Sequence, residues 1–266
     1  MPDNISERAS AELRQSTCVH TQKILDSCIN KDCVENLRVH LTPESQTALN
    51  TATNVKARCC ELLYAYIDVQ PIAYNRGHHT VDITFYYQIL GDISVTGTRP
   101  TNLNGLAVFS KRVVLFGGLS EAKIFSSNTV GITVDPLSGC IQPTAVVEVV
   151  DPMILSATVL EGPNVRNPDP ALSDVPEAIM EYFGGALVTQ DEVKKLYVTL
   201  GQFSTIRLER DSQLRIFDCV NCIPNKECCD DPGCAEAPCD LFSRIAFPTR
   251  AFFPDEPLQK KDCCEN

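Results

Sequence analysis

Tryptophan is absent from this chain of 266 residues, and histidine, the commonest general base in enzymes, occurs only four times. The chain also lacks a nucleophile elbow, a phosphate-binding loop, a glycine-rich dinucleotide motif and the paired-histidine helix of zinc proteases. These absences predict a protein that is not an enzyme and has no catalytic residues and no cofactor.

Long apolar runs and an excess of basic residues are missing as well. No run approaches the roughly 20 apolar residues of a membrane-spanning helix, so we expect no membrane span. The net charge of -11 argues against a nucleic-acid partner, because phosphates attract basic surfaces. Residues 1–10 are polar and lack the basic and apolar stretches of a secretory signal peptide, so we expect no export by that route.

Cysteine, in contrast, is abundant, with 14 copies. Because the cytosol keeps thiols reduced, this number indicates disulfides formed outside the cell, metal binding, or thiols stored until a later oxidation. The last option agrees with the polar start of the chain. Spore-surface proteins, for example, are made in the mother cell without a signal peptide and meet air only after lysis.

The N-terminal part of the sequence predicts a helical segment after a mobile arm. The spacing of one helix face is followed by Thr21, Ile24, Leu25, Cys28 and Ile29. We expect residues 1–35 to form this arm and helix, residues 36–217 a β-rich core domain, and residues 218–266 a cysteine-rich irregular tail.

Two segments carry the prediction of antiparallel β structure. Residues 63–70 and 81–89 alternate between two faces and are rich in β-branched and aromatic side chains. A turn at residues 75–77 would join them into a hairpin. Further strands are expected at residues 36–41, 105–116, 129–134, 144–150, 154–160, 195–200 and 205–210, with one short helix at about 177–183. The pattern predicts a mainly β fold with an antiparallel β-sandwich-like core domain.

Three cysteine doublets stand out, at residues 59–60, 228–229 and 263–264. Adjacent cysteines rarely bond to each other, because the small ring distorts the planar trans peptide. Each doublet is therefore expected to reach two different partners. On a strand, Cys59 and Cys60 would point to opposite faces, so that one bonds within the subunit and the other faces outward.

All the cysteines are candidates for disulfide cross-links, and two arrangements stay open. Exposed cysteines near the ends of the sequence would bond between subunits, because exposed thiols exchange readily. Alternatively, all of them pair internally. The candidates are Cys18, Cys28, Cys33, Cys59, Cys60, Cys140, Cys219, Cys222, Cys228, Cys229, Cys234, Cys239, Cys263 and Cys264.

A metal site is the alternative use of the tail cysteines. Cys219 and Cys222 form a C-x-x-C pair, and Cys228 and Cys229 follow closely. The second C-x-x-C pair of a zinc ribbon is absent, and the spacing is not diagnostic of zinc or of an iron–sulfur cluster. We expect no metal, and these four cysteines are the ligands if the alternative holds.

Other conspicuous side chains have ordinary interpretations. His78 and His79 are interpreted as solvated loop residues rather than metal ligands, because adjacent side chains on an extended chain diverge. The acids Asp230, Asp231 and Asp240 are interpreted as solvated rather than calcium-binding. Three tyrosines on exposed strand faces are expected to pack against a neighbouring sheet or subunit: Tyr64, Tyr66 and Tyr86.

Several stretches resemble those of uncharacterised cysteine-rich proteins of spore-forming Firmicutes, chiefly clostridia. They are Leu25-Asp-Ser-Cys28-Ile-Asn-Lys-Asp-Cys33-Val-Glu-Asn-Leu-Arg-Val, Phe217-Asp-Cys219, Ile223-Pro-Asn-Lys-Glu-Cys228 and Cys239-Asp-Leu-Phe-Ser-Arg-Ile-Ala-Phe-Pro. The resemblance spans nearly the whole chain. By analogy with cysteine-rich proteins of exosporium layers, coats and appendages, it implies self-assembly into a disulfide-linked lattice or filament.

Together these observations predict a structural, self-assembling subunit of a disulfide-cross-linked spore-surface layer or extracellular filament. Its main partner would be further copies of itself, joined in part by intermolecular disulfides, with other spore-surface proteins as possible neighbours. A cytosolic zinc-binding or redox regulatory protein with a cysteine-rich module is the alternative. A secreted monomeric binding module, with every disulfide internal, is a third class.

Overall fold

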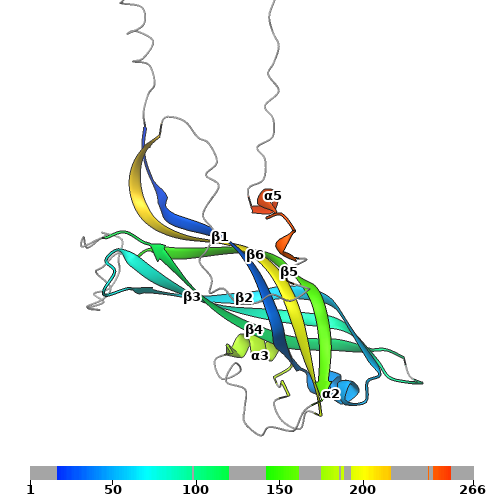
Figure 1. Cartoon of the computed structure of the whole chain (residues 1–266). Coiled ribbons are helices and arrows are strands. Elements are labelled where there is room, and N and C mark those ends of the chain that lie inside the picture. Colours follow the sequence, from blue (N-terminus) through cyan, green and yellow to red (C-terminus); the bar gives the residue numbers. More distant parts are fainter. Residues whose placement is uncertain are drawn as a thin grey trace, which may run out of the picture.

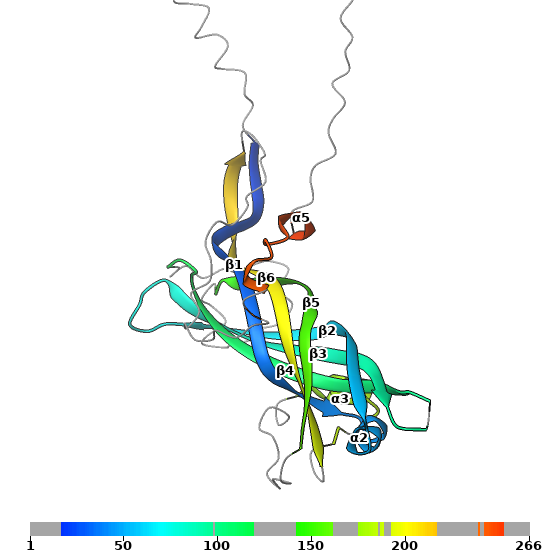
Figure 2. The same ribbon diagram turned by 45° about the vertical axis from the view of Figure 1, so that its right-hand side comes forward.

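The computed structural model of the chain describes residues 17–97, 99–119, 142–161, 175–185, 187–188, 193–216, 239 and 242–252. In this part, six strands form one antiparallel sheet in the order β2-β3-β4-β1-β6-β5. Figures 1 and 2 show that the sheet is strongly curled. The prediction of a mainly β, antiparallel fold is confirmed, whereas the two stacked sheets of a sandwich are not seen in the described residues.

The elements follow one another along the chain with short helices between long strands. In order they are β1 (Thr17–Leu41), α2 (Pro43–Asn50), β2 (Asn54–Pro71), β3 (His78–Ser94), β4 (Thr101–Phe116), β5 (Thr144–Glu161), α3 (Glu177–Tyr182), β6 (Lys194–Ile216) and α5 (Thr249–Phe252). The helix predicted at about 177–183 corresponds to α3, and α2 was not predicted. The strand predicted at 129–134 and the arm at 1–16 lie outside the described residues.

The hairpin predicted from alternation is present as β2 and β3. The two strands pair from Asn54 opposite Ser94 to Pro71 opposite His79. The turn between them contains Gly77, whose φ of +82° lies in the left-handed region that favours glycine. The local sequence therefore predicted this part of the fold correctly.

The helix predicted before residue 36 is wrong, because residues 17–41 form the single strand β1. This strand pairs with β6 along nearly its whole length, so long-range hydrogen bonding overrides the local helical spacing. Register shifts on β1, one between Ile24 and Asp26 and one between Val34 and Leu37, change the phase of the strand alternation. Such phase changes hide the two-residue hydrophobic period of a strand from a reading of the sequence. The expected domain boundary between residues 35 and 36 falls inside β1.

Two other predicted pairs of strands are continuous. Residues 144–150 and 154–160 both belong to β5, which has an irregularity around Pro152, and residues 195–200 and 205–210 both belong to β6. Proline lacks a backbone donor and is tolerated on an edge strand, which β5 is. The proline therefore interrupts the ladder without ending the strand.

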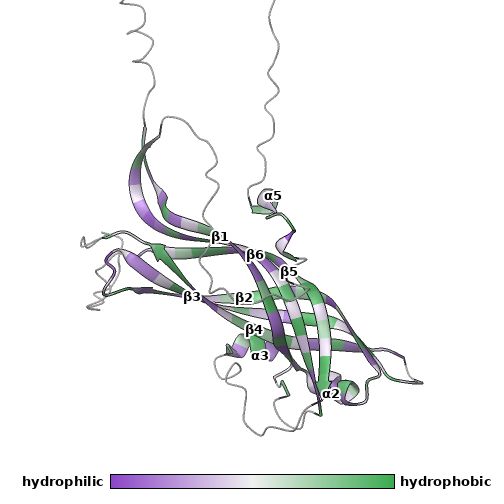
Figure 3. Ribbon diagram, in the orientation of Figure 1, coloured by the Kyte–Doolittle hydropathy of each residue, from purple (hydrophilic) through white to green (hydrophobic). Residues whose placement is uncertain are grey.

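The hydrophobic core fills the inside of the curl. Strand β3 supplies alternate buried residues from Val81 to Ile89, and β6 supplies Leu196, Val198 and Leu200 before a polar stretch. In Figure 3 apolar and polar residues alternate along the strands of the curl. Leu49 of α2 is fully buried against this core. Helix α2 thus covers one end of the curl.

The outer face of β3 and β4 carries a second, smaller cluster. Ile179 and Phe183, within and just after α3, pack against Tyr86 and Leu106. The Tyr182 hydroxyl donates to Gln88 Oε1 at 3.1 Å. Helix α3 therefore covers the sheet from outside.

One end of the sheet narrows to a two-stranded ribbon. Thr17–Ile24 of β1 pairs with Glu209–Ile216 of β6, whereas β5 reaches only as far as Glu209. Figure 1 shows this ribbon extending beyond the curl, and Figure 3 colours much of it as hydrophilic. The ribbon has no third strand among the described residues, so its backbone edges are open.

The two edge strands of the curled sheet, β2 and β5, contact each other without a ladder. At one point the Leu62 amide donates to Asp151 Oδ1 at 3.2 Å. We call this contact line the seam. It holds the curl together by side-chain contacts rather than by paired backbone.

Candidate functional site

A disulfide joins Cys33 of β1 to Cys239, with the two Cα atoms 5.5 Å apart. It attaches a short C-terminal segment, residues 239 and 242–252, to the outside of β1 and β6 (Figure 1). The prediction that the tail cannot bury a core alone agrees with this attachment, because the segment is both bonded and docked.

Aromatic packing fixes the docked segment. The Phe242 ring is 2% exposed and lies 4.8 Å from the Phe203 ring, measured between centroids. It covers Gly201, where an added Cβ would lie 2.6 Å from the ring. Lys31 Nζ donates to the carbonyl oxygens of Ser243 at 2.7 Å and Ile245 at 2.6 Å. Glycine at 201 is thus required for the ring to approach the strand.

The one group with metal-ligand composition in the described residues is Cys33, Glu35 and Cys239, whose ligand atoms all lie within 4.8 Å of one another. A cysteine binds a metal as its thiolate, and both of these sulfurs are consumed by the disulfide. While that bond is intact, the group offers only the Glu35 carboxylate. Cys219, Cys222, Cys228 and Cys229, the ligands of the zinc alternative, lie outside the described residues.

The remaining described cysteines fall into three environments. Cys28 is fully buried and disulfide-bonded. Cys18 on the ribbon and Cys59 on the edge strand β2 are free and exposed, whereas Cys60 is free and buried. The other candidates, Cys140, Cys234, Cys263 and Cys264 among them, lie outside the described residues.

For the Cys59–Cys60 doublet, the predicted divergence of the two side chains is confirmed. The two side chains point to opposite faces of β2, as strand alternation requires. The expected internal disulfide of the inward cysteine is not formed. Burial raises the pKa of Cys60 to about 12, and the charges of Cys59 and Asp151 act in the same direction. Cys60 is therefore a protonated, weakly reactive thiol at neutral pH.

Inside the curl, sequence reasoning missed a polar cluster formed by Asn30, Asp32, Tyr87, Lys111, Gln202 and Ser204. Lys111 Nζ lies 2.6 Å from Asp32 Oδ1, and Asn30 Nδ2 donates to Asp32 Oδ2. The Tyr87 hydroxyl donates to Gln202 Oε1, and burial raises the pKa of Tyr87 well above its usual value. Phe109, Lys111 and Val113 are alternate residues of β4, so they share one face of the strand. This alternation was a signal that could have predicted an inward-facing Lys111.

The histidine pair also differs from its interpretation. His78 and His79 begin β3, and they diverge as expected, but His79 is 6% exposed rather than solvated. Burial and the charge of Arg210 lower the pKa of His79. His78 packs edge-on against Phe116, with centroids 5.4 Å apart. The two imidazoles therefore do not form one site.

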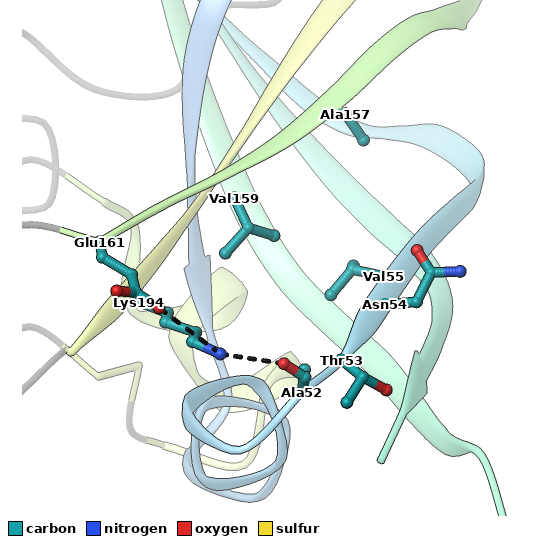
Figure 4. A pocket seen from close by; sticks show the side chains of 8 residues that line it. All are labelled: Ala52, Thr53, Asn54, Val55, Ala157, Val159, Glu161 and Lys194. Atoms are coloured by element: carbon teal, nitrogen blue, oxygen red, sulfur yellow. Dashed lines mark hydrogen bonds and ion pairs between the residues drawn. The ribbon is translucent and has the colours of Figure 1, made fainter. Parts of the chain in front are cut away.

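A cleft of about 330 Å³ lies at one end of the seam (Figure 4). Its lining comes from the turn before β2, the start of β2, the end of β5 and the first residue of β6: Ala52, Thr53, Asn54, Val55, Ala157, Val159, Glu161 and Lys194. Lys194 Nζ donates to the Ala52 carbonyl at 2.9 Å and lies 3.8 Å from Glu161 Oε1. The two charged groups of the cleft thus form an ion pair in which the Glu161 side chain is exposed.

No protein-family model, curated protein or solved structure matches the chain. None of the helices in the described part has the length and apolar character of a transmembrane segment.

Proposed function

We propose that the protein is a structural subunit that assembles with copies of itself and is cross-linked by disulfides, on a spore surface or in an extracellular filament. The observation that carries the proposal is the division of the cysteines: Cys33–Cys239 is a bond within the subunit, whereas Cys18 and Cys59 are exposed and free. Exposed thiols are the ones that can exchange with a neighbouring molecule.

The positions of the two exposed thiols support assembly. Cys18 lies on the ribbon, which has no third strand among the described residues, and Cys59 is exposed on the edge strand β2, which meets β5 at the seam. Open edges are surfaces on which further strands can pair. A contact between copies at either place would bring an exposed thiol to the interface, where a disulfide can lock it.

The disulfide-bonded cysteines of the described part, Cys28, Cys33 and Cys239, support the proposed location. Disulfides persist in oxidising surroundings and are rare in the cytosol. A protein that carries the Cys33–Cys239 bond is therefore suited to a surface exposed to air.

Electrophoresis without reductant tests the proposal. We expect the full chain, oxidised in air, to give a ladder of disulfide-linked species that a thiol reductant collapses and a chelator leaves intact. Cys18→Ser and Cys59→Ser should weaken the ladder, whereas Cys60→Ser, which removes the buried thiol, should not. A single monomer band from air-oxidised protein would contradict the proposal, and stoichiometric zinc with reduced thiols would favour the zinc-binding alternative.

A further inference from the structure

Three side chains of complementary chemistry meet inside the curl. Asn30 is 3% exposed, and the side chains of Lys111 and Asp32 are 7% and 8% exposed. One oxygen of the Asp32 carboxylate lies 2.6 Å from Lys111 Nζ, and the other accepts from Asn30 Nδ2. A single carboxylate thus bridges an amine and a primary amide.

Their surroundings are largely apolar. Lys111 on β4 lies opposite Ile83 on β3, and the neighbouring pair, Phe85 and Phe109, stacks with centroids 6.1 Å apart. Phe85 and Ile83 are essentially unexposed. Burying a charged pair carries a desolvation penalty that its mutual attraction often fails to repay, so a buried amine and carboxylate are weakly explained by stability alone.

Two polar atoms of the cluster, Ser204 Oγ and Gln202 Nε2, have no hydrogen-bond partner among the described residues. Ser204 lies directly opposite Asn30 in the β1–β6 register, and its buried Oγ is unpaired in the described part of the chain. Gln202 lies opposite Asp32, and its buried Nε2 is also unpaired in the described part of the chain. Unpaired buried donors are uncommon and call for an explanation. Neither atom is hydrogen-bonded to the Asn30 carboxamide oxygen in this structure. After a small side-chain rearrangement, we expect both to donate to that oxygen as it gains negative charge.

We propose that Lys111 and Asn30 join as an intramolecular amide, an isopeptide bond, with Asp32 as the proton carrier. Asp32 accepts a proton from the Lys111 ammonium, and the neutral Nζ attacks Cγ of Asn30. The carbonyl electrons move to oxygen, which Ser204 Oγ and Gln202 Nε2 stabilise. Asp32 then protonates Nδ2, the Cγ–Nδ2 bond breaks, and the carbonyl re-forms. Nζ loses its second proton, and nitrogen leaves as ammonium, so atoms and charge balance without an added reagent.

The bond would join β1 and β4 at a position where their backbones are not paired. Strands β1 and β4 are neighbours, but their backbones pair only from Val39–Leu41 to Gly105–Ala107. Asn30 and Lys111 lie beyond these pairs, on parts of the two strands that have no ladder between them. Farther along, the Phe116 amide of β4 donates to Asp26 Oδ2 of β1 at 3.0 Å. A covalent link there would hold β1 to β4 at a point that has no ladder. This inference is independent of any bond between subunits.

Mass spectrometry of the reduced, alkylated full chain tests it. We expect the wild-type mass to be lower by one ammonia, about 17 Da, than the mass calculated for the fully alkylated sequence. After trypsin, a branched peptide should join residues 24–31, which contain Asn30, to the peptide that contains Lys111. An unmodified mass in the folded protein overturns the proposal. Loss of water with a branch at Asp32 also overturns it, because Asn30 is then not the reacting group.

Variants separate chemistry from folding. Asn30→Ala, Lys111→Met and Asp32→Asn should each lose the branched peptide and the loss of ammonia, whereas Lys194→Met should keep both. Because these changes alter a buried cluster, Ser204→Ala serves as the milder variant. It leaves all three reacting groups in place and is expected to slow ammonia loss after refolding by about 10²-fold, with an unchanged circular dichroism spectrum. An unchanged rate of ammonia loss in Ser204→Ala would show that Ser204 does not stabilise the oxyanion. The branched peptide in Asn30→Ala would overturn the assignment of Asn30 as the reacting amide.

Discussion

Cys59 and Cys60 are neighbours in the sequence, yet their environments give them opposite chemistry. The Cys59 side chain is exposed on the outer face of β2, whereas Cys60 is 4% exposed and has its pKa raised to about 12. The thiolate is the nucleophile in exchange and alkylation. Reactivity at neutral pH therefore belongs to the outward residue of the doublet.

This contrast predicts selective labelling. We expect N-ethylmaleimide at pH 8 to modify Cys18 and Cys59 in the folded protein and to leave Cys60 unmodified, because a pKa of about 12 lowers its thiolate fraction by roughly 10³ relative to an ordinary cysteine. Peptide mass mapping after a short reaction measures the three sites. Protein unfolded in urea is the control, in which all three should react alike. Equal rates at Cys59 and Cys60 in folded protein would contradict the expectation.

His79 gives the fold a dependence on acid. Its pKa is lowered by burial and by the charge of Arg210, so below pH 6.5 the unfolded chain binds a proton that the folded chain resists. Its contribution to stability is therefore complete above about pH 6.5 and is lost as the pH falls. We expect His79→Gln to reduce the fall in urea midpoint between pH 7 and pH 5. His20→Gln, which changes an exposed histidine, should behave as wild type.

Residue chemistry was predictable in part. Alternation predicted that Cys59 and Cys60 would diverge, because that depends only on local strand geometry. The cluster of Asn30, Asp32 and Lys111 could not be predicted, since it depends on β1 lying beside β4 and on both strands turning those residues inward. Neither fact is local.

At the scale of elements, prediction succeeded where a strand pairs with its neighbour in sequence and failed where it pairs with a distant one. The β2–β3 hairpin followed from alternation and a turn. Strand β1 pairs with β6, the last of the described strands, and its register shifts imitate helical spacing. The strand's length and partner come from this distant ladder rather than from its own composition.

The docking of the C-terminal segment depends on the lack of a side chain at Gly201. An alanine Cβ at Gly201 would lie 2.6 Å from the Phe242 ring, so the ring must move. We expect Gly201→Ala to lower the free energy of unfolding by about 1–3 kcal/mol and to increase proteolysis within residues 242–252. Urea unfolding and limited proteolysis measure the two effects. In a Phe242→Ala background the same substitution should have little effect, and an undiminished loss there would contradict the mechanism.

On the scale of the whole molecule, the seam is the least secured line of the curl. Sequence patterns predicted strands but gave no order for them, so neither the curl nor the meeting of β2 with β5 could be foreseen. Two strands that meet without a ladder leave no periodic signature, because their contact rests on a few side chains such as Asp151.

Asp151→Ala should therefore loosen the seam. It removes the acceptor of the Leu62 amide, at a cost of about 0.5–1.5 kcal/mol, and a charge that helps to raise the pKa of Cys60. We expect faster hydrogen exchange in β2 and faster maleimide labelling of Cys60. Glu161→Ala, at the exposed end of the same seam, should leave Cys60 labelling unchanged. Unaltered labelling in Asp151→Ala would show that Cys60 is protected by other contacts.

The Cys33–Cys239 bond spans 206 residues and encloses β2 to β6 in one covalent ring. Cys18 precedes this ring in the sequence, and Cys263 and Cys264 follow it. Tension applied between these positions can pass from Cys33 to Cys239 through the disulfide and so bypass the strands in between. The ring thereby protects β2 to β6 from being pulled apart by force until a reductant opens it.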